Sequence, residues 1–238
     1  MRLWVIAAMT PLAACGAGAT ESAPRGASTT RSFALADFTG VALKGSDDVI
    51  VTVGSAFSVR AEGPAEELER LKITRDGATL NVGRERGSSF DWGSTRGAGV
   101  KVYVSMPQIA AASVAGSGDM KVDRAAGREF SGDVAGSGDL MIGVLQASAA
   151  KLSVAGSGGI VARGAAESLT LAVAGSGDID ARGMKASSAR VSIAGSGDVS
   201  ANIDGPAEVS IMGSGNALLG AGAKCTVSKM GSGDVRCG

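Results

Sequence analysis

Apolar and polar residues alternate with a period of two through most of the second half of the chain. At regular intervals the alternation is interrupted by a small residue followed by Gly-Ser-Gly and, in most copies, Asp. A period of two places successive side chains on opposite faces of a β-strand. Each copy therefore predicts a strand, a sharp corner and a second strand, with one face buried. Helical repeats are excluded, because their local period would be about 3.6 residues.

The motif recurs seven times, with steps of 20, 20, 19, 20, 18 and 18 residues between copies. The copies are Ala115–Asp119, Ala135–Asp139, Ala155–Gly159, Ala174–Asp178, Ala194–Asp198, Met212–Asn216 and Met230–Asp234. A fixed period of this size indicates a solenoid. The Leu/Asn ladder of leucine-rich repeats is missing. Stacked copies would pair each strand in parallel with its equivalent in the next coil, so the sequence predicts an all-β parallel β-helix.

The Gly-Ser-Gly-Asp corners are the most conspicuous candidate sites. The five complete copies consist of Gly116, Ser117, Gly118 and Asp119; Gly136, Ser137, Gly138 and Asp139; Gly175, Ser176, Gly177 and Asp178; Gly195, Ser196, Gly197 and Asp198; and Gly231, Ser232, Gly233 and Asp234. Glycine-rich turns can bind phosphate through backbone N–H groups. However, no Gly-Lys-Ser/Thr follows, and no G-x-G-x-x-G opens a helix. We interpret the copies as structural corners that need glycine because it tolerates positive φ.

The aspartates of these corners should stack into a ladder. Its members would be Asp119, Asp139, Asp178, Asp198 and Asp234, with interruptions at Gly159 and Asn216. Strands about 4.8 Å apart bring exposed carboxylates to a distance at which they repel by about 1 kcal/mol in water, so the ladder does not require a metal. A Ca²⁺ site would need about six to eight converging oxygens. We expect no metal and no cofactor, and each Asp capping its own turn.

Residues 32–105 are less regular but still strand-like. The segment Val41–Val51 resembles a divergent copy of the repeat, and short alternating strands are predicted at residues 58–61, 71–74, 80–82 and 100–104. Residues 65–71, after Pro64, predict one or two helical turns. The Gly/Ser-rich stretch 84–99, with Phe90 and Trp92, predicts an exposed loop. Asp47 and Asp48 form an adjacent acidic pair, but on a strand they would face opposite sides.

The N-terminus carries the features of an exported lipoprotein. An apolar run too short to span a bilayer ends in Leu12-Ala13-Ala14-Cys15, which resembles the bacterial lipobox. We expect residues 1–14 to be a signal peptide, Cys15 to be lipidated and residues 15–31 to be a flexible tether. An ordinary signal peptide ending near a cysteine is the alternative. Gly16 stands where lipoproteins retained in the inner membrane often carry Asp, so the outer membrane is the expected location.

Two cysteines lie close to the C-terminus of the sequence. Cys225 and Cys237 are six residues before and six residues after Gly231, and the alternation points both side chains into the final coil. In an exported protein this arrangement favours a disulfide over two buried thiols. Lys229 takes an inward position, which fits a last coil that opens to solvent and limits edge-to-edge pairing.

The order of these segments resembles a known family. A Val-x-Leu-x-Gly-Ser segment, a strand ending at Val104-Ser105-Met106-Pro107 and then Gly-Ser-Gly-Asp coils are similar to the head GIN domain, a family labelled a putative auto-transporter adhesin. The resemblance covers residues 33–238. It implies a right-handed parallel β-helix, here with about 18–20 residues per coil, in bacterial envelope proteins that are often lipoproteins. It supplies no catalytic residues.

The amino-acid composition argues against several classes of function. The 23 basic residues balance the 23 acidic ones, histidine is absent and aromatic residues make up 3%. These values argue against nucleic-acid binding and exclude every histidine-dependent mechanism. We expect a non-enzymatic, lipid-anchored envelope protein with residues 32–238 as an adhesion or interaction domain. Its partners would be the membrane, through the lipid, and an envelope protein or polysaccharide. A periplasmic structural or stress-related lipoprotein and a carbohydrate-active β-helix enzyme are the alternatives.

Overall fold

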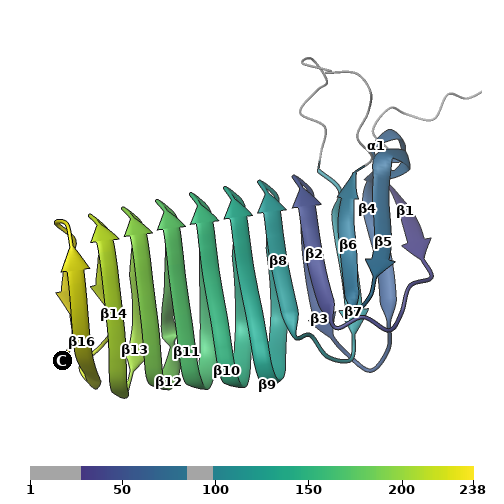
Figure 1. Cartoon of the computed structure of the whole chain (residues 1–238). Coiled ribbons are helices and arrows are strands. Elements are labelled where there is room, and N and C mark those ends of the chain that lie inside the picture. Colours follow the sequence, from purple (N-terminus) through teal and green to yellow (C-terminus); the bar gives the residue numbers. More distant parts are fainter. Residues whose placement is uncertain (1–27, 85–98) are drawn as a thin grey trace, which may run out of the picture.

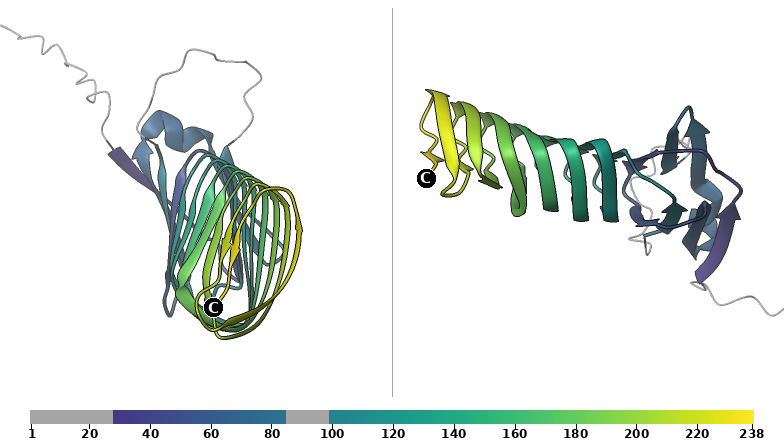
Figure 2. Two further views of the ribbon diagram at one scale, coloured as in Figure 1. Left: turned by 90° about the vertical axis from the view of Figure 1, so that its left-hand side faces the viewer. Right: turned by 90° about the horizontal axis from the view of Figure 1, so that it is seen from below.

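A right-handed parallel β-solenoid forms most of the molecule (Figure 1), which confirms the predicted fold. The computed structural model describes residues 28–84 and 99–238. The repeat region contains β8 (Ala111–Gly116), β9 (Met120–Gly136), β10 (Leu140–Gly156), β11 (Gly159–Gly175), β12 (Asp178–Gly195), β13 (Val199–Ile203), β14 (Gly205–Gly213), β15 (Ala217–Leu218), β16 (Ala223–Met230) and β17 (Val235–Arg236). Each long strand begins after one Gly-Ser-Gly corner, bends at the opposite edge and ends at the next corner (Figure 2).

The alternating apolar residues stack in rows inside the solenoid. One row consists of Val114, Val134, Val154, Val173, Ile193 and Ile211, each of which is at most 2% exposed. The pairing register places these residues opposite one another in successive coils. Burial of each such side chain contributes about 1.5–3 kcal/mol, so the repeat stabilises the fold through a continuous apolar interior.

The first coil of the stack comes from the divergent copy that the sequence indicates at Val41–Val51. It consists of β2 (Gly40–Gly45) and β3 (Asp48–Val53). β2 pairs in parallel with β8, with Gly45 opposite Gly116, and β3 pairs with β9. The chain thus leaves the solenoid after β3 and rejoins the same stack at β8. The sequence pattern alone does not reveal this excursion.

The excursion closes the N-terminal end of the solenoid. β6 (Thr79–Arg84) and β7 (Lys101–Met106) form an outer coil parallel to β2 and β3. β5 (Leu71–Asp76), β4 (Ser58–Pro64) and β1 (Ser28–Phe33) then continue the sheet by antiparallel pairing. We call this outer coil, these three strands and α1 the N-terminal cap.

One short helix occurs among the described residues, α1 (Ala65–Arg70), and it agrees with the expectation for residues 65–71. It follows Pro64, carries Glu66 and Glu67 in its first turn and ends with Arg70, an order that complements the helix dipole. Leu68 is the buried residue of the helix. The helix therefore covers the apolar end of the cap with one side chain, and Glu66, Glu69 and Arg70 are exposed to solvent.

The first described strand begins before the expected domain boundary at residue 32. The tether expected at residues 15–31 is wrong at its end, because residues 28–31 lie in β1, which pairs with β4 from Ser28 to Phe33. The paired backbone, not the polar composition, decides the structure there. The expected signal peptide, the lipidated Cys15 and the loop residues Phe90 and Trp92 lie outside the described residues.

Candidate interaction surface

Each Gly-Ser-Gly corner is bonded to the corner of the preceding coil. The N–H groups of Ser137 and Gly138 both donate to the carbonyl oxygen of Gly116, at 2.9 and 3.0 Å. The same double contact recurs at the corners that begin with Gly116, Gly156, Gly175, Gly195 and Gly213. A phosphate cradle would need such N–H groups to be free. Their use within the stack supports the structural interpretation of the motif.

Both glycines of a corner are required by this contact. Gly136 has a φ of 131°, and a Cβ there would lie 2.3 Å from the carbonyl oxygen of Gly116. A Cβ at Gly138 would lie 2.1 Å from the oxygen of Gly118. The second glycine is thus needed for close approach of two backbones, whereas the first also needs the left-handed φ region.

The expectation that each corner aspartate caps its own turn is wrong. The Oδ1 of Asp119 accepts the N–H of Asp139 at 3.0 Å, and the Oδ1 of Asp139 accepts the N–H of Gly159 at 2.7 Å. The pattern continues from Asp178 to Asp198, from Asp198 to Asn216 and from Asn216 to Asp234. The side chain therefore links one coil to the next, because the backbone beside the corner leaves an N–H that the carboxylate can reach.

Gly159 shows what happens where the ladder is interrupted. Without a side chain at residue 159, the N–H of Asp178 donates instead to the carbonyl oxygen of Gly158, at 3.3 Å. The N–H of the residue at the Asp position of this corner is thus bonded to a backbone oxygen, over a longer distance than the aspartate bonds. No cluster of three or more acidic or cysteine side chains suited to a metal occurs among the described residues, and the ladder acts as an inter-coil connection.

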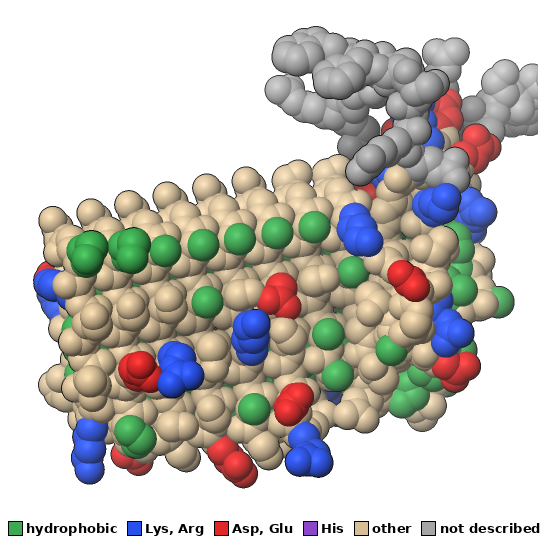
Figure 3. All heavy atoms as spheres, in the orientation of Figure 1, with side chains coloured by type: hydrophobic (Ala, Val, Ile, Leu, Met, Phe, Trp, Pro, Cys, Tyr) green, Lys and Arg blue, Asp and Glu red, His purple; other side chains and the backbone are tan. Residues whose placement is uncertain are grey.

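One broad face of the solenoid carries few charges. On the strands that lead into the corners, Figure 3 shows an apolar row beside the corner edge and sparse charged side chains below it. The register assigns that row to Ala115, Ala135, Ala155, Ala174, Ala194, Met212 and Met230. Met212 and Met230 are 62% and 70% exposed. The exposed apolar area on this face is therefore concentrated in the last two coils.

A groove of about 780 Å³ crosses five coils at the edge opposite the corners. Its floor is a stacked row of Ala147, Ala166, Ala186 and Ile203. Polar side chains, among them Gln146, Glu167, Lys185, Asn202 and Asp204, line its sides. A second hollow of about 440 Å³ continues onto the broad face, beside Arg190 and Glu208.

The repeat shortens along the length of the groove. The corner spacing falls from 20 to 18 residues after Gly195. The register of β13 against β12 skips from Ala181 to Lys185, so residues are lost at the bend opposite the corners. The groove extends across this change of period, from Gln146 of β10 to Gly222 before β16. The change of period is the only sign of this feature in the sequence, and the groove itself is not predicted from it.

A buried ion-pair cluster connects the N-terminal cap to the first corner. Asp47 is fully buried, and its carboxylate accepts from Nε and Nη2 of Arg84 at 2.9 and 2.5 Å. Arg84 also pairs with Glu67 of α1. The hydrogen bonds with Asp47 raise the pKa of the Arg84 guanidinium above its usual value. Arg84, expected to begin an exposed loop, thus ends β6 in a half-buried site.

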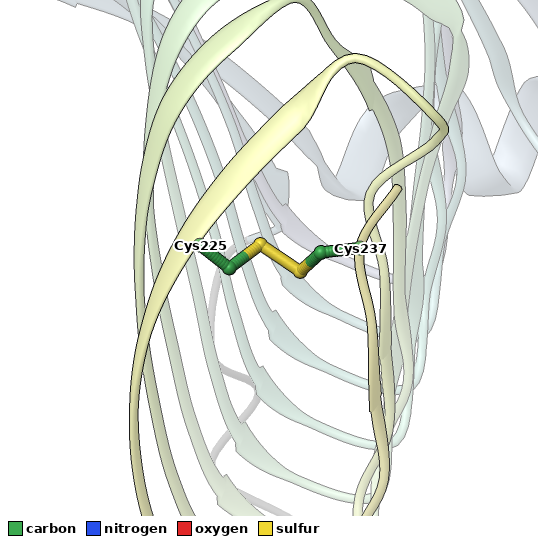
Figure 4. The surroundings of a disulfide bond; sticks show 2 residues. All are labelled: Cys225 and Cys237. Atoms are coloured by element: carbon green, nitrogen blue, oxygen red, sulfur yellow. A yellow bond between two sulfur atoms is a disulfide. The ribbon is translucent and has the colours of Figure 1, made fainter.

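The last coil is closed by a disulfide. Cys225 of β16 and Cys237, just after β17, are bonded with a Cα–Cα distance of 6.2 Å, the pairing that the sequence favours. Figure 4 shows the bond crossing the interior between the two walls of the coil. Beyond it the interior is open: Val227 is 46% exposed, whereas the stacked Val209 is 1% exposed. Lys229 stacks on Ile211 at an inward position and is exposed, as expected.

The sequence profile of the family described as "Putative auto-transporter adhesin, head GIN domain" matches residues 37–222. The chain belongs to this family. The matched part of the head GIN domain extends from just before the first coil to the last bend before β16. The resemblance stated from the Gly-Ser-Gly-Asp coils is thereby confirmed.

Solved structures share the head GIN fold. A structure of a putative adhesin from Bacteroides fragilis is 18% identical, covers 88% of this chain and 96% of its own, and has a TM-score of 0.76. Parabacteroides distasonis provides a putative adhesin (20% identity, 90% and 98% coverage, TM-score 0.65). It also provides a putative lipid binding protein (22% identity, 89% and 96% coverage, TM-score 0.62). No curated protein gives a significant match. Among the described residues, no helix is long and apolar enough to cross a membrane.

Proposed function

We propose that the protein is a lipid-anchored envelope protein whose head GIN domain binds a partner without transforming it. The observation that carries this proposal is the groove across five coils, with its apolar floor and its polar sides. Such a surface can hold an extended molecule by many weak contacts. The Gly-Ser-Gly amides and the corner carboxylates, which a catalytic site could have used, are engaged between coils.

The lining of the groove favours a polypeptide partner over a polysaccharide. Its walls contain alanine, serine, amide and charged side chains, and none of the aromatic rings that stack on sugars. Glu167 and Asp204 offer negative charge and Lys185 offers positive charge. An extended peptide with side chains of both signs would match this arrangement.

A binding assay with two charge variants tests the site. Attachment of the protein to cells and to isolated envelope proteins is measured for Lys185→Glu, in the groove, and for Lys151→Glu, an exposed lysine outside it. We expect Lys185→Glu to weaken attachment and Lys151→Glu to leave it unchanged. Equal attachment of both variants and the unaltered protein would remove the groove from the proposal.

Location is tested by protease treatment of intact cells, with Cys15→Ala as the comparison for anchoring. Cleavage on intact cells, together with release of the Cys15→Ala protein from the membrane fraction, supports a lipid-anchored adhesin. Cleavage only after the outer membrane is opened would contradict adhesion to other cells and favour a periplasmic structural protein. New reducing ends or unsaturated products from a panel of polysaccharides would contradict the non-catalytic part of the proposal.

A further inference from the structure

The two ends of the solenoid differ in how they finish. At the N-terminal end, β4, β5 and α1 cover the outer coil. At the C-terminal end, β16 pairs only with β14 and β17 only with β15 in the described chain. One edge of β16 therefore has unpaired backbone groups, which are a template for a further strand.

The open end also exposes apolar surface beside that edge. Val227 is 46% exposed, and the Cys225–Cys237 disulfide is only partly covered. Val209, the residue stacked on Val227 in the preceding coil, is 1% exposed because the last coil covers it. The apolar centre at the end of the solenoid thus has the shape and chemistry of a coil interface with one coil missing.

Side chains at this end favour an acidic strand. The last coil carries three cations, Lys224, Lys229 and Arg236, against one carboxylate side chain, that of Asp234. Within the stack, Arg190 and Glu208 pair across adjacent coils at 2.7 Å, so opposite charges in one row form ion pairs in this fold. Acidic residues on the outer face of an added strand would meet Lys224 in the same way, because Lys224 lies on the outer face of β16 and Lys229 on the inner face.

We propose that the C-terminal coil is a strand acceptor: an extended acidic segment of a partner protein adds as a β-strand beside β16. Such addition gives affinity through main-chain hydrogen bonds and selectivity through alternate side chains. Two copies of this chain meeting at these ends would oppose their lysines, and head-to-tail stacking is blocked by the N-terminal cap. The cap is also the end at which β1, and with it the preceding N-terminal segment, joins the fold (Figure 1). An anchored molecule would therefore present the acceptor at its far end, and this inference rests on the proposed interaction function.

The test uses the full-length protein in detergent and a short fluorescent peptide in which valine alternates with glutamate. The expected result is saturable binding that falls at least about tenfold when alternate peptide nitrogens are methylated, because methylation removes main-chain donors. We also expect Lys224→Glu, on the outer face that the glutamates would share, to weaken binding at least about tenfold. Lys151→Glu, which reverses an exposed lysine on a central coil, should bind the peptide normally.

Several outcomes would overturn the proposal. Undiminished binding of the methylated peptide would exclude strand addition, and equal loss in Lys151→Glu would show general charge attraction. Sedimentation of the unaltered protein as a dimer that the peptide dissociates would assign the edge to a second copy. Failure of the peptide with intact attachment to cells would remove this inference and leave the proposed function. Peptide binding without attachment to cells or envelope proteins would contradict the proposed function and support the strand acceptor.

Discussion

Individual glycines and aspartates hold the coils of this protein in register. The corner glycines accept a left-handed φ and allow carbonyl oxygens of the neighbouring coil to approach closely. Four corner aspartates each accept a backbone N–H from the next coil: Asp119, Asp139, Asp178 and Asp198. The sequence predicted the glycine requirement because only glycine fits such corners repeatedly. It did not predict the aspartate bonds, because their donors lie about twenty residues away.

A corner glycine has to adopt a positive φ and to leave room for the backbone of the neighbouring coil. Substitutions at Gly136 and Gly45 separate these two requirements. Both have φ near 130–140°, but a Cβ at Gly136 meets a backbone oxygen at 2.3 Å, whereas a Cβ at Gly45 meets nothing within 4 Å. We expect Gly45→Ala to lower the free energy of unfolding by about 1–3 kcal/mol through backbone strain. Gly136→Ala should cost more than about 4 kcal/mol or prevent folding, as measured by chemical denaturation. Equal costs would contradict the close-approach argument.

The aspartate ladder predicts a position-dependent effect. Asp198→Ala removes the acceptor for the backbone N–H and the side-chain amide of Asn216, and should destabilise the protein by about 0.5–1.5 kcal/mol. Asp234→Ala is the control, because no later coil in the described chain donates to its carboxylate. We expect no measurable change in the control. A similar loss in both variants would indicate a role within the turn.

At the scale of elements, the connection between the cap and the first coil depends on one arginine. Arg84 ends β6, Asp47 lies between β2 and β3, and Glu67 belongs to α1. Arg84 thereby holds three segments that are separate in sequence. The sequence showed that Asp47 and Asp48 are adjacent, but it did not predict the burial of Asp47. The cation that pairs with Asp47 is Arg84, which belongs to the excursion and is distant in sequence.

Loss of this cation should destabilise the cap strongly. Arg84→Gln leaves the carboxylate of Asp47 buried without a cation, and we expect a loss of about 3–5 kcal/mol. The control is Arg182→Gln, which breaks an exposed pair; Arg182 lowers the pKa of Asp180 through a side-chain hydrogen bond. The control should change stability by at most about 1 kcal/mol. Denaturation midpoints that coincide for the two variants would argue against a structural role for the buried pair.

At the scale of the whole molecule, the solenoid has one covered end and one open end. The excursion between β3 and β8 supplies the antiparallel strands that finish the N-terminal side. On the other side a disulfide spans the last coil. Because each coil contacts only its neighbours, loss of stability at one end should spread little through the stack.

Removal of the disulfide tests this locality. In the chain-entropy model a bond closing so short a loop contributes about 2–3 kcal/mol. We expect Cys225→Ser combined with Cys237→Ser to increase hydrogen exchange at the amides of β16 and β17 while leaving β9 and β10 protected. Increased exchange throughout the solenoid would show instead that the last coil supports the entire stack.

The sequence by itself determined the coil. The period of two, the spacing of the corners and the inward cysteines are local properties, and they were sufficient for the parallel β-helix, its register and the disulfide pairing. The tertiary structure decided what depends on residues far apart in the chain. These features are the placement of β2 and β3 inside the stack, the cap, the burial of Asp47 against Arg84 and the groove where the coils shorten. Each arises from contacts between segments that no local pattern relates, so only the folded chain brings them together.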